Sequence, residues 1–136
     1  MTDRRAIIPA ANRDAATALN MSPAILSGGF LFLTGTTGSD ADGVMPTDPE
    51  AQFRSAFAKI ETVLGEAGLT SADVVEMTTY HVGLRDHFDL FDKVRLDCFG
   101  APYPAWTAVE VAGLRREGAV VEIRVIARAH ASSKTP

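Results

Sequence analysis

Two stretches near the C-terminal end of the chain alternate between apolar and polar residues. The first runs from Ala105 to Val111 and the second from Ala119 to Ala127. Because side chains of a strand point to alternate faces, both stretches are predicted to be β-strands. Glu122 and Arg124 share one face of the second strand, and the opposite face is uniformly apolar. The polar residues between the stretches predict that they pair as a hairpin with a long loop.

Two further stretches have the spacing of amphipathic helices. The first begins at Asp48, a good N-terminal cap, and continues with Pro49, which suits the first helical position. It is predicted to extend to Ala67, and Gly68 suits its C-terminal end. The second helix is predicted from Asp86 to Phe99. The two apolar stripes consist of Phe53, Ala56, Phe57, Ile60, Val63, Leu64 and Ala67, and of Phe88, Phe91, Val94 and Cys98.

The remaining strands are short and apolar. Residues 24–26 and 30–36 are predicted to form a hairpin around Ser27-Gly28-Gly29, and residues 74–82 form a further strand. A short extra strand is expected around Ile7, and residues 37–47 form a surface loop. Two helices cover only one face of such a sheet. Since the other face is partly apolar, self-association is expected to bury it.

Length and composition limit the class of protein. The 136 residues fit a single domain, residues 1–136, and 46% of them are hydrophobic. A net charge of −4, without a basic track, argues against a nucleic-acid partner. No apolar stretch is long enough to span a bilayer, so a cytoplasmic protein without a membrane partner is expected. Cys98 is the single cysteine, which excludes an intrachain disulfide, and it is expected to be a buried filler.

A carboxylate among apolar neighbours needs a partner or a chemical role, and Glu122 is the first candidate. It could activate a water molecule, or it could form an ion pair with Arg124 or a neighbouring subunit. Glu110 is expected to be a solvated or interface charge. His81 fits either a cleft or the core, whereas His87 is expected to be solvated. The histidines are too scattered for a recognised metal motif, so no metal is predicted.

Several short segments together resemble the Rid family, the YjgF-type proteins also called endoribonuclease L-PSP-like. The resemblance covers nearly the whole chain. It implies an α+β, chorismate-mutase-like mixed sheet with two helices on one face, assembled as a homotrimer with ligand clefts between subunits. It also implies hydrolysis of reactive enamines and imines without a cofactor. The matching segments are Asn20-Met21-Ser22-Pro23-Ala24, Leu31-Phe32-Leu33-Thr34-Gly35, Gln52, Leu64-Gly65-Glu66-Ala67-Gly68, Asp73-Val74-Val75, Phe99, Pro104-Ala105 and Val121-Glu122-Ile123.

The resemblance also implies roles for single residues. The position of the family glutamate that orients the attacking water is occupied by Glu122. Thr34 matches a serine that lines the cleft. The family arginine that clamps a substrate carboxylate is replaced by Trp106, and a pocket tyrosine is replaced by Met21. Indole offers one neutral donor and a flat apolar face, so a larger and less charged ligand is expected. Two interpretations of Trp106 remain open: its ring forms a wall of the cleft, or it is an aromatic side chain buried in a subunit interface.

Two weaker candidates complete the predicted site. Arg124 lies on the face of Glu122 and could replace the missing cation, and Ser22 adjoins Met21. The leading hypothesis is a trimer that binds a small metabolite and hydrolyses an imine, enamine or related reactive group. The alternative is a non-catalytic ligand-binding or chaperone-like trimer, which the missing arginine favours. The acidic charge argues against an endoribonuclease.

Overall fold

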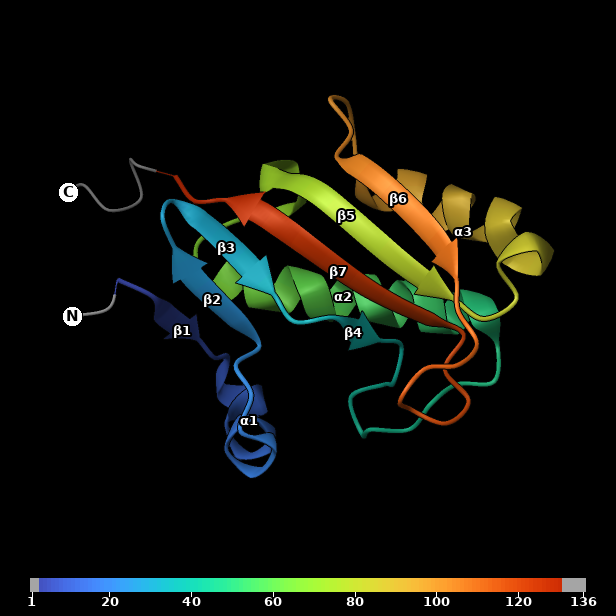
Figure 1. The fold of residues 1–136 in the computed structure, drawn as a ribbon, viewed down its shortest axis with the longest axis horizontal. Helices are drawn as coiled ribbons and strands as arrows, with labels where there is room; N and C mark the ends of the chain where they lie inside the picture. Colours follow the sequence, from blue (N-terminus) through green and yellow to red (C-terminus); the bar gives the residue numbers. More distant parts are fainter. Residues whose placement is uncertain (1–2, 131–136) are drawn as a thin grey trace.

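The computed structural model describes residues 3–130 and consists of one mixed β-sheet with helices packed against it (Figure 1). The strand order is β1-β2-β3-β7-β5-β6, and β4 pairs with β7 beyond the end of β3. Among the described strands, β5 and β6 run parallel, and the other pairs are antiparallel. The strands are β1 Arg5–Ile7, β2 Ala24–Ser27, β3 Phe30–Leu33, β4 Thr36–Thr37, β5 Val74–His81, β6 Ala105–Glu110 and β7 Val121–Arg128.

Within residues 3–130, three α-helices accompany the sheet: α1 Arg13–Leu19, α2 Pro49–Glu66 and α3 Leu84–Cys98. Two 3-10 turns, Ala10–Asn12 and Ser71–Asp73, complete the elements. Helices α2 and α3 lie behind the sheet in Figure 1, as the two-helix prediction requires. Helix α1 was not predicted: none of its residues is buried, so it has no apolar stripe that could reveal it. The observed architecture is a mixed α+β fold with three helices.

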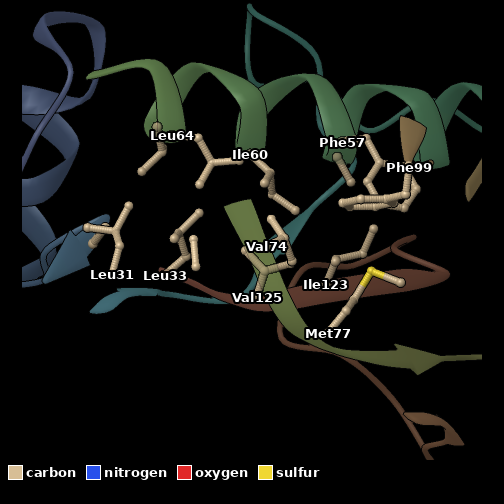
Figure 2. Packing of buried hydrophobic residues seen from close by; sticks show 14 of the residues in the cluster. Leu31, Leu33, Phe57, Ile60, Leu64, Val74, Met77, Phe99, Ile123 and Val125 are labelled. Atoms are coloured by element: carbon tan, nitrogen blue, oxygen red, sulfur yellow. The ribbon is translucent and has the colours of Figure 1, made fainter. Parts of the chain in front are cut away.

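Helix α2 begins and packs as its sequence indicates. The carboxylate of Asp48 accepts a hydrogen bond from the amide of Ala51, at 3.1 Å, with Pro49 in the first turn. The apolar stripe of α2 then faces the sheet, and Figure 2 shows it above β3, β5 and β7. The fully buried residues of β7 are the four on its predicted apolar face. The labelled residues of this interface are Leu31, Leu33, Phe57, Ile60, Leu64, Val74, Met77, Phe99, Ile123 and Val125.

The predicted hairpin of β6 with β7 is wrong. Strand β5 lies between them, and Trp106 on β6 pairs with Met77 on β5. Strand β5, helix α3 and strand β6 form a βαβ crossover, which places β6 parallel to β5 at the edge of the sheet. Strand β7 instead lies at the centre, between β3 and β5, where its apolar face is covered by α2. The shorter hairpin of β2 with β3, turning at Gly28 and Gly29, is confirmed.

One buried glutamine fastens two long loops to the start of α2. Gln52 is fully buried, and its amide nitrogen donates to the carbonyls of Pro46, at 2.7 Å, and Gly118, at 2.9 Å. Its amide oxygen accepts from the backbone N–H of Val120, at 2.9 Å. Since a buried amide must be hydrogen-bonded, this side chain fixes both segments that flank the end of the sheet.

Candidate functional site

Glu122 lies on the sheet face that α2 and α3 leave open. On β7 it alternates with the buried residues Val121 and Ile123, and it pairs in register with Tyr80 on β5 and Thr37 on β4. This face carries large apolar side chains: Phe30 and Phe32 are 41% and 38% exposed. The expectation of a partly apolar open face is therefore confirmed. Glu122 is a half-buried carboxylate within that face.

The carboxylate of Glu122 rests against the backbone of Gly35. A Cβ atom added to Gly35 would lie 2.3 Å from Oε2 of Glu122, far inside van der Waals contact. Only glycine leaves room for this approach. The residue that links β3 to β4 thus fixes where the carboxylate lies.

The carboxylate of Glu122 has no hydrogen bond or ion pair within residues 3–130. Arg124, its neighbour two residues along the same face, forms no ion pair with it. The described chain therefore leaves the lone pairs of the Glu122 carboxylate open to water or to another molecule, which is what a general base requires.

Trp106 lies on the opposite side of the sheet, beneath α3. Its indole N–H donates to the hydroxyl of Thr79, at 2.9 Å. Its ring stacks on Phe88, with centroids 5.7 Å apart and an angle of 3° between the planes. The guanidinium carbon of Arg95 lies 4.5 Å from the ring centroid, a cation–π contact. Within one chain, Trp106 and Glu122 do not form a common site.

A buried histidine pair lies next to Trp106. His81 is fully buried, its Nε2 lies 2.7 Å from the Thr79 hydroxyl, and its Nδ1 lies 3.2 Å from Nε2 of His87. Burial and, to a smaller extent, the charge of His87 lower the pKa of His81 to about 4, while the charge of Glu110 opposes the shift. His81 therefore belongs to the core. The expected solvation of His87 is wrong, because its half-buried ring also packs edge-on against Phe53.

Glu110 anchors the start of α3. Its two carboxylate oxygens accept hydrogen bonds from the backbone N–H groups of Gly83, at 3.0 Å, and Leu84, at 2.6 Å. These bonds lower the pKa of Glu110. The carboxylate satisfies free amides at a helix N-terminus, a role that the sequence did not indicate because strand β6 and helix α3 had not been placed together.

The other predicted site residues gather at the far end of β3. The hydroxyl of Thr34 donates to the carbonyl of Ser22, at 2.7 Å. Thr34 and Met21 line a groove between α1 and α2, and Lys59 of α2 lies in the same groove. The structure therefore brings Met21, Ser22 and Thr34 together, and separately Glu122 with Arg124. Lys59 was missed in the sequence because it lies at a helix position that reads as a solvated charge.

The described residues offer no evident metal site or membrane span. No group of three or more His, Cys, Asp or Glu side chains within residues 3–130 is arranged to hold a metal ion. None of the helices in this part of the chain is both long and apolar enough to cross a bilayer.

Comparison with known proteins gives consistent matches along nearly the whole chain. The family model Endoribonuclease L-PSP matches residues 12–129. The RutC family protein YjgH of Escherichia coli is 38% identical over 129 residues, which are 94% of this chain and 97% of that protein. A solved structure of protein YjgH superposes with a TM-score of 0.84 at 37% identity, covering 93% of this chain and 96% of the other.

A Mycobacterium tuberculosis member of the YjgF/YER057c/UK114 family superposes with a TM-score of 0.78 at 31% identity, covering 93% of this chain and 99% of that one. The two solved structures each superpose over 93% of the chain, so they share its overall fold. The chain therefore belongs to the Rid family, the YjgF-type proteins described by the Endoribonuclease L-PSP model.

Proposed function

We propose that this protein is a cytoplasmic homotrimer that binds a small metabolite between subunits and hydrolyses an imine or enamine with water activated by Glu122. The observation that carries the proposal is the carboxylate itself. Glu122 is half-buried on an open, partly apolar face, rests against Gly35, and has no partner within residues 3–130. A structural carboxylate in such surroundings is normally paired, whereas one that activates water needs its lone pairs free.

The reaction requires a positioned water and a base. Glu122 accepts a proton from water as the water oxygen attacks the carbon of the protonated imine, which gives a carbinolamine. The carboxylic acid of Glu122 then protonates the amine nitrogen, and the carboxylate takes the hydroxyl proton as the carbon–nitrogen bond breaks, so that a carbonyl compound and ammonia are released. An enamine enters the same sequence after it tautomerises to the imine. No redox step or cofactor takes part.

The open face supports assembly. Phe30 and Phe32, both about two-fifths exposed, neighbour the half-buried Ile126 across β3 and β7. Contact with a second subunit would remove this apolar surface from water. Because Trp106 and Glu122 lie on opposite sides of one chain, a cleft can contain both only when different subunits contribute them. The proposed site therefore needs the assembly.

The geometry of Trp106 supports a ligand of low charge. Its N–H is engaged by Thr79 and its ring contacts Phe88 and Arg95, so the indole offers a ligand no free hydrogen-bond donor and no charge of its own. Arg95, which lies over that ring, is already bound to Asp92 at 2.6 Å. In the proposed cleft, Arg124 is the remaining candidate for substrate contact, because Thr34, Met21 and Ser22 gather at the end of β3 beside the groove between α1 and α2.

The alternative is a trimer that binds a ligand without reaction. The observation in its favour is that Trp106 lacks the charged fork with which an arginine would orient a carboxylate. In that case Glu122 would form an ion pair with a cation of a neighbouring subunit.

Ammonia release and particle mass test the proposal. Imines can be produced in situ by flavin oxidases, from benzylamine for a neutral aromatic imine and from alanine for an anionic 2-imino acid. We expect the protein to accelerate ammonia release from the neutral imine much more than from the 2-imino acid, and light scattering to give about three chains per particle. A stable monomer would exclude the intersubunit cleft, and release at the spontaneous rate from both imines would favour the alternative.

A further inference from the structure

The groove between α1 and α2 is a concave site on the helix side of the sheet. Its volume is about 500 Å³. The walls come from α1 and the segment after it, from the end of β3, and from the exposed flank of α2. Leu19 and Met21 are 51% and 44% exposed, although both face this concavity. Large apolar side chains that line a groove and remain exposed are a binding signal rather than a random surface feature.

The groove also contains a half-buried cation. Lys59 donates from Nζ to the hydroxyl of Ser39, at 2.9 Å, and forms no ion pair with a carboxylate in the described chain. Burial lowers the pKa of Lys59, and the charge of Arg116 lowers it further, while the charge of Asp40 raises it. Two cations and one anion therefore act here, which leaves an excess of one positive charge.

Asp40 is not free to neutralise Lys59 directly. Its Oδ1 accepts hydrogen bonds from the backbone N–H groups of Asp42 and Val44, both at 2.9 Å, so the carboxylate closes its own loop. Arg116, on the other side, donates to the carbonyl of Gly43, at 2.8 Å. The nearby charges are thus engaged in holding the loop, and the ammonium of Lys59 is the group that remains for a ligand.

We propose that this groove binds a small amphiphilic carboxylate, with its carboxylate on Lys59 and its aliphatic body against Leu19, Met21 and Val63. The carboxylate supplies the missing negative charge beside a partly desolvated ammonium, where an ion pair is stronger than at the surface. The aliphatic body covers Leu19 and Met21, which are otherwise in contact with water. A neutral ligand would satisfy only the second requirement, and a cationic one would oppose the first.

This site is separate from the one proposed for hydrolysis. Lys59 belongs to α2 on the helix side, whereas Glu122 lies on the open face. The proposal therefore does not depend on the reaction at Glu122, and Glu122→Gln is expected to leave binding in the groove unchanged.

Octanoate is the probe, compared with octan-1-ol, which has the same chain length without the charge. Titration of the assembled protein, followed by methyl NMR signals of Leu19, Met21 and Val63 and by calorimetry, should give saturable octanoate binding and at least tenfold weaker binding of octan-1-ol. Lys59→Met should weaken octanoate binding at least tenfold. Lys93→Met, at an exposed position on α3 outside the groove, should not.

Three results would overturn the proposal: no saturable change at these methyl groups, equal affinity for octanoate and octan-1-ol, or equal losses in Lys59→Met and Lys93→Met. The comparison of the two probes uses the unmodified protein, so it decides the question even where Lys59→Met fails to fold.

Discussion

The indole N–H of Trp106 donates to the hydroxyl of Thr79, which in turn lies 2.7 Å from Nε2 of the buried His81. Because the indole is a donor only, the Thr79 oxygen accepts from it. The ring nitrogens of His81 then connect this hydroxyl to His87, since Nδ1 of His81 lies 3.2 Å from Nε2 of His87. A side chain on the edge strand is thereby joined through buried polar groups to α3.

This arrangement predicts that Trp106→Arg, the change toward the family arginine, destabilises the protein. The variant loses the stack on Phe88 and the bond to Thr79, and it places a second guanidinium near Arg95, which lies 4.5 Å from the ring. We expect the free energy of unfolding to fall by about 2–4 kcal/mol. Urea denaturation measures this change. Trp106→Phe keeps an aromatic ring and should lose less; equal stability of Trp106→Arg and the unmodified protein would contradict the structural role.

Gly35→Ala tests the position of Glu122 without altering its charge. The added Cβ would lie 2.3 Å from Oε2 of Glu122, so the carboxylate must move. Since the displaced atom ends a flexible side chain, the fold should survive, whereas hydrolysis should fall by about tenfold to hundredfold. Ammonia release and thermal melting measure the two effects.

Gly65→Ala is the matched control for that substitution. A Cβ on Gly65 would meet nothing within 4 Å, and the residue is exposed on α2. It should leave hydrolysis unchanged and stabilise the helix by about 0.5–1 kcal/mol. Full activity in Gly35→Ala would show that hydrolysis does not depend on the exact position of the Glu122 carboxylate.

Gln52→Leu should be strongly destabilising. It removes a buried side chain that makes three hydrogen bonds, to Pro46, Gly118 and Val120, and leaves those backbone groups unpaired. The expected loss is about 3 kcal/mol or more. Ser55→Ala, which removes one bond to the carbonyl of Ser39, should lose about 1 kcal/mol by the same denaturation experiment. Similar losses in both variants would contradict the anchoring role of Gln52.

Acid should destabilise the fold through the buried histidines. The pKa of His81 is lowered from 6.5 to about 4, chiefly by burial and then by the charge of His87, while Glu110 opposes the shift. Below pH 6.5 the unfolded chain therefore binds a proton that the folded chain does not, so stability falls as the pH falls toward 4. The shift corresponds to about 3 kcal/mol at pH 4.

Denaturation at pH 7, 5.5 and 4 measures this effect, and His81→Gln should show a shallower dependence. His87, whose pKa is also lowered by burial against the opposing charges of Glu110 and Asp86, adds in the same direction and keeps some slope in that variant. If the free energy of unfolding depends on pH identically in the unmodified protein and in His81→Gln, His81 does not cause the loss of stability in acid.

The strength of a local pattern explains which elements the sequence predicted. Helix α2 has a capping Asp48, Pro49 and a continuous apolar stripe, and β7 has strict alternation, so both were found nearly to the residue. Helix α1 buries nothing and was missed. The pairing of β6 with β5 is set by a crossover through α3, which no feature of β6 alone indicates.

Local patterns predicted the candidate site only in part, for the same reason. Alternation on β7 correctly placed Glu122 opposite the core. On β6 it grouped Trp106 with Glu110, yet which face the pair occupies depends on the register with β5, where Met77 and His81 are their partners. The partners of Glu110 and Lys59 come from loops and helices distant in sequence, so their roles emerge only from the tertiary structure.

Glu122→Gln tests the central claim most directly, with Glu76→Gln, an exposed carboxylate on β5, as the control. The amide keeps the size of the side chain but cannot accept the proton of water. If Glu122 activates water, turnover of the neutral imine should fall by roughly 10²–10⁴-fold, with ligand binding and melting temperature nearly unchanged, and Glu76→Gln should retain full turnover. Unchanged turnover together with a lowered melting temperature or a weakened assembly would contradict the account and make Glu122 an ion-pair partner.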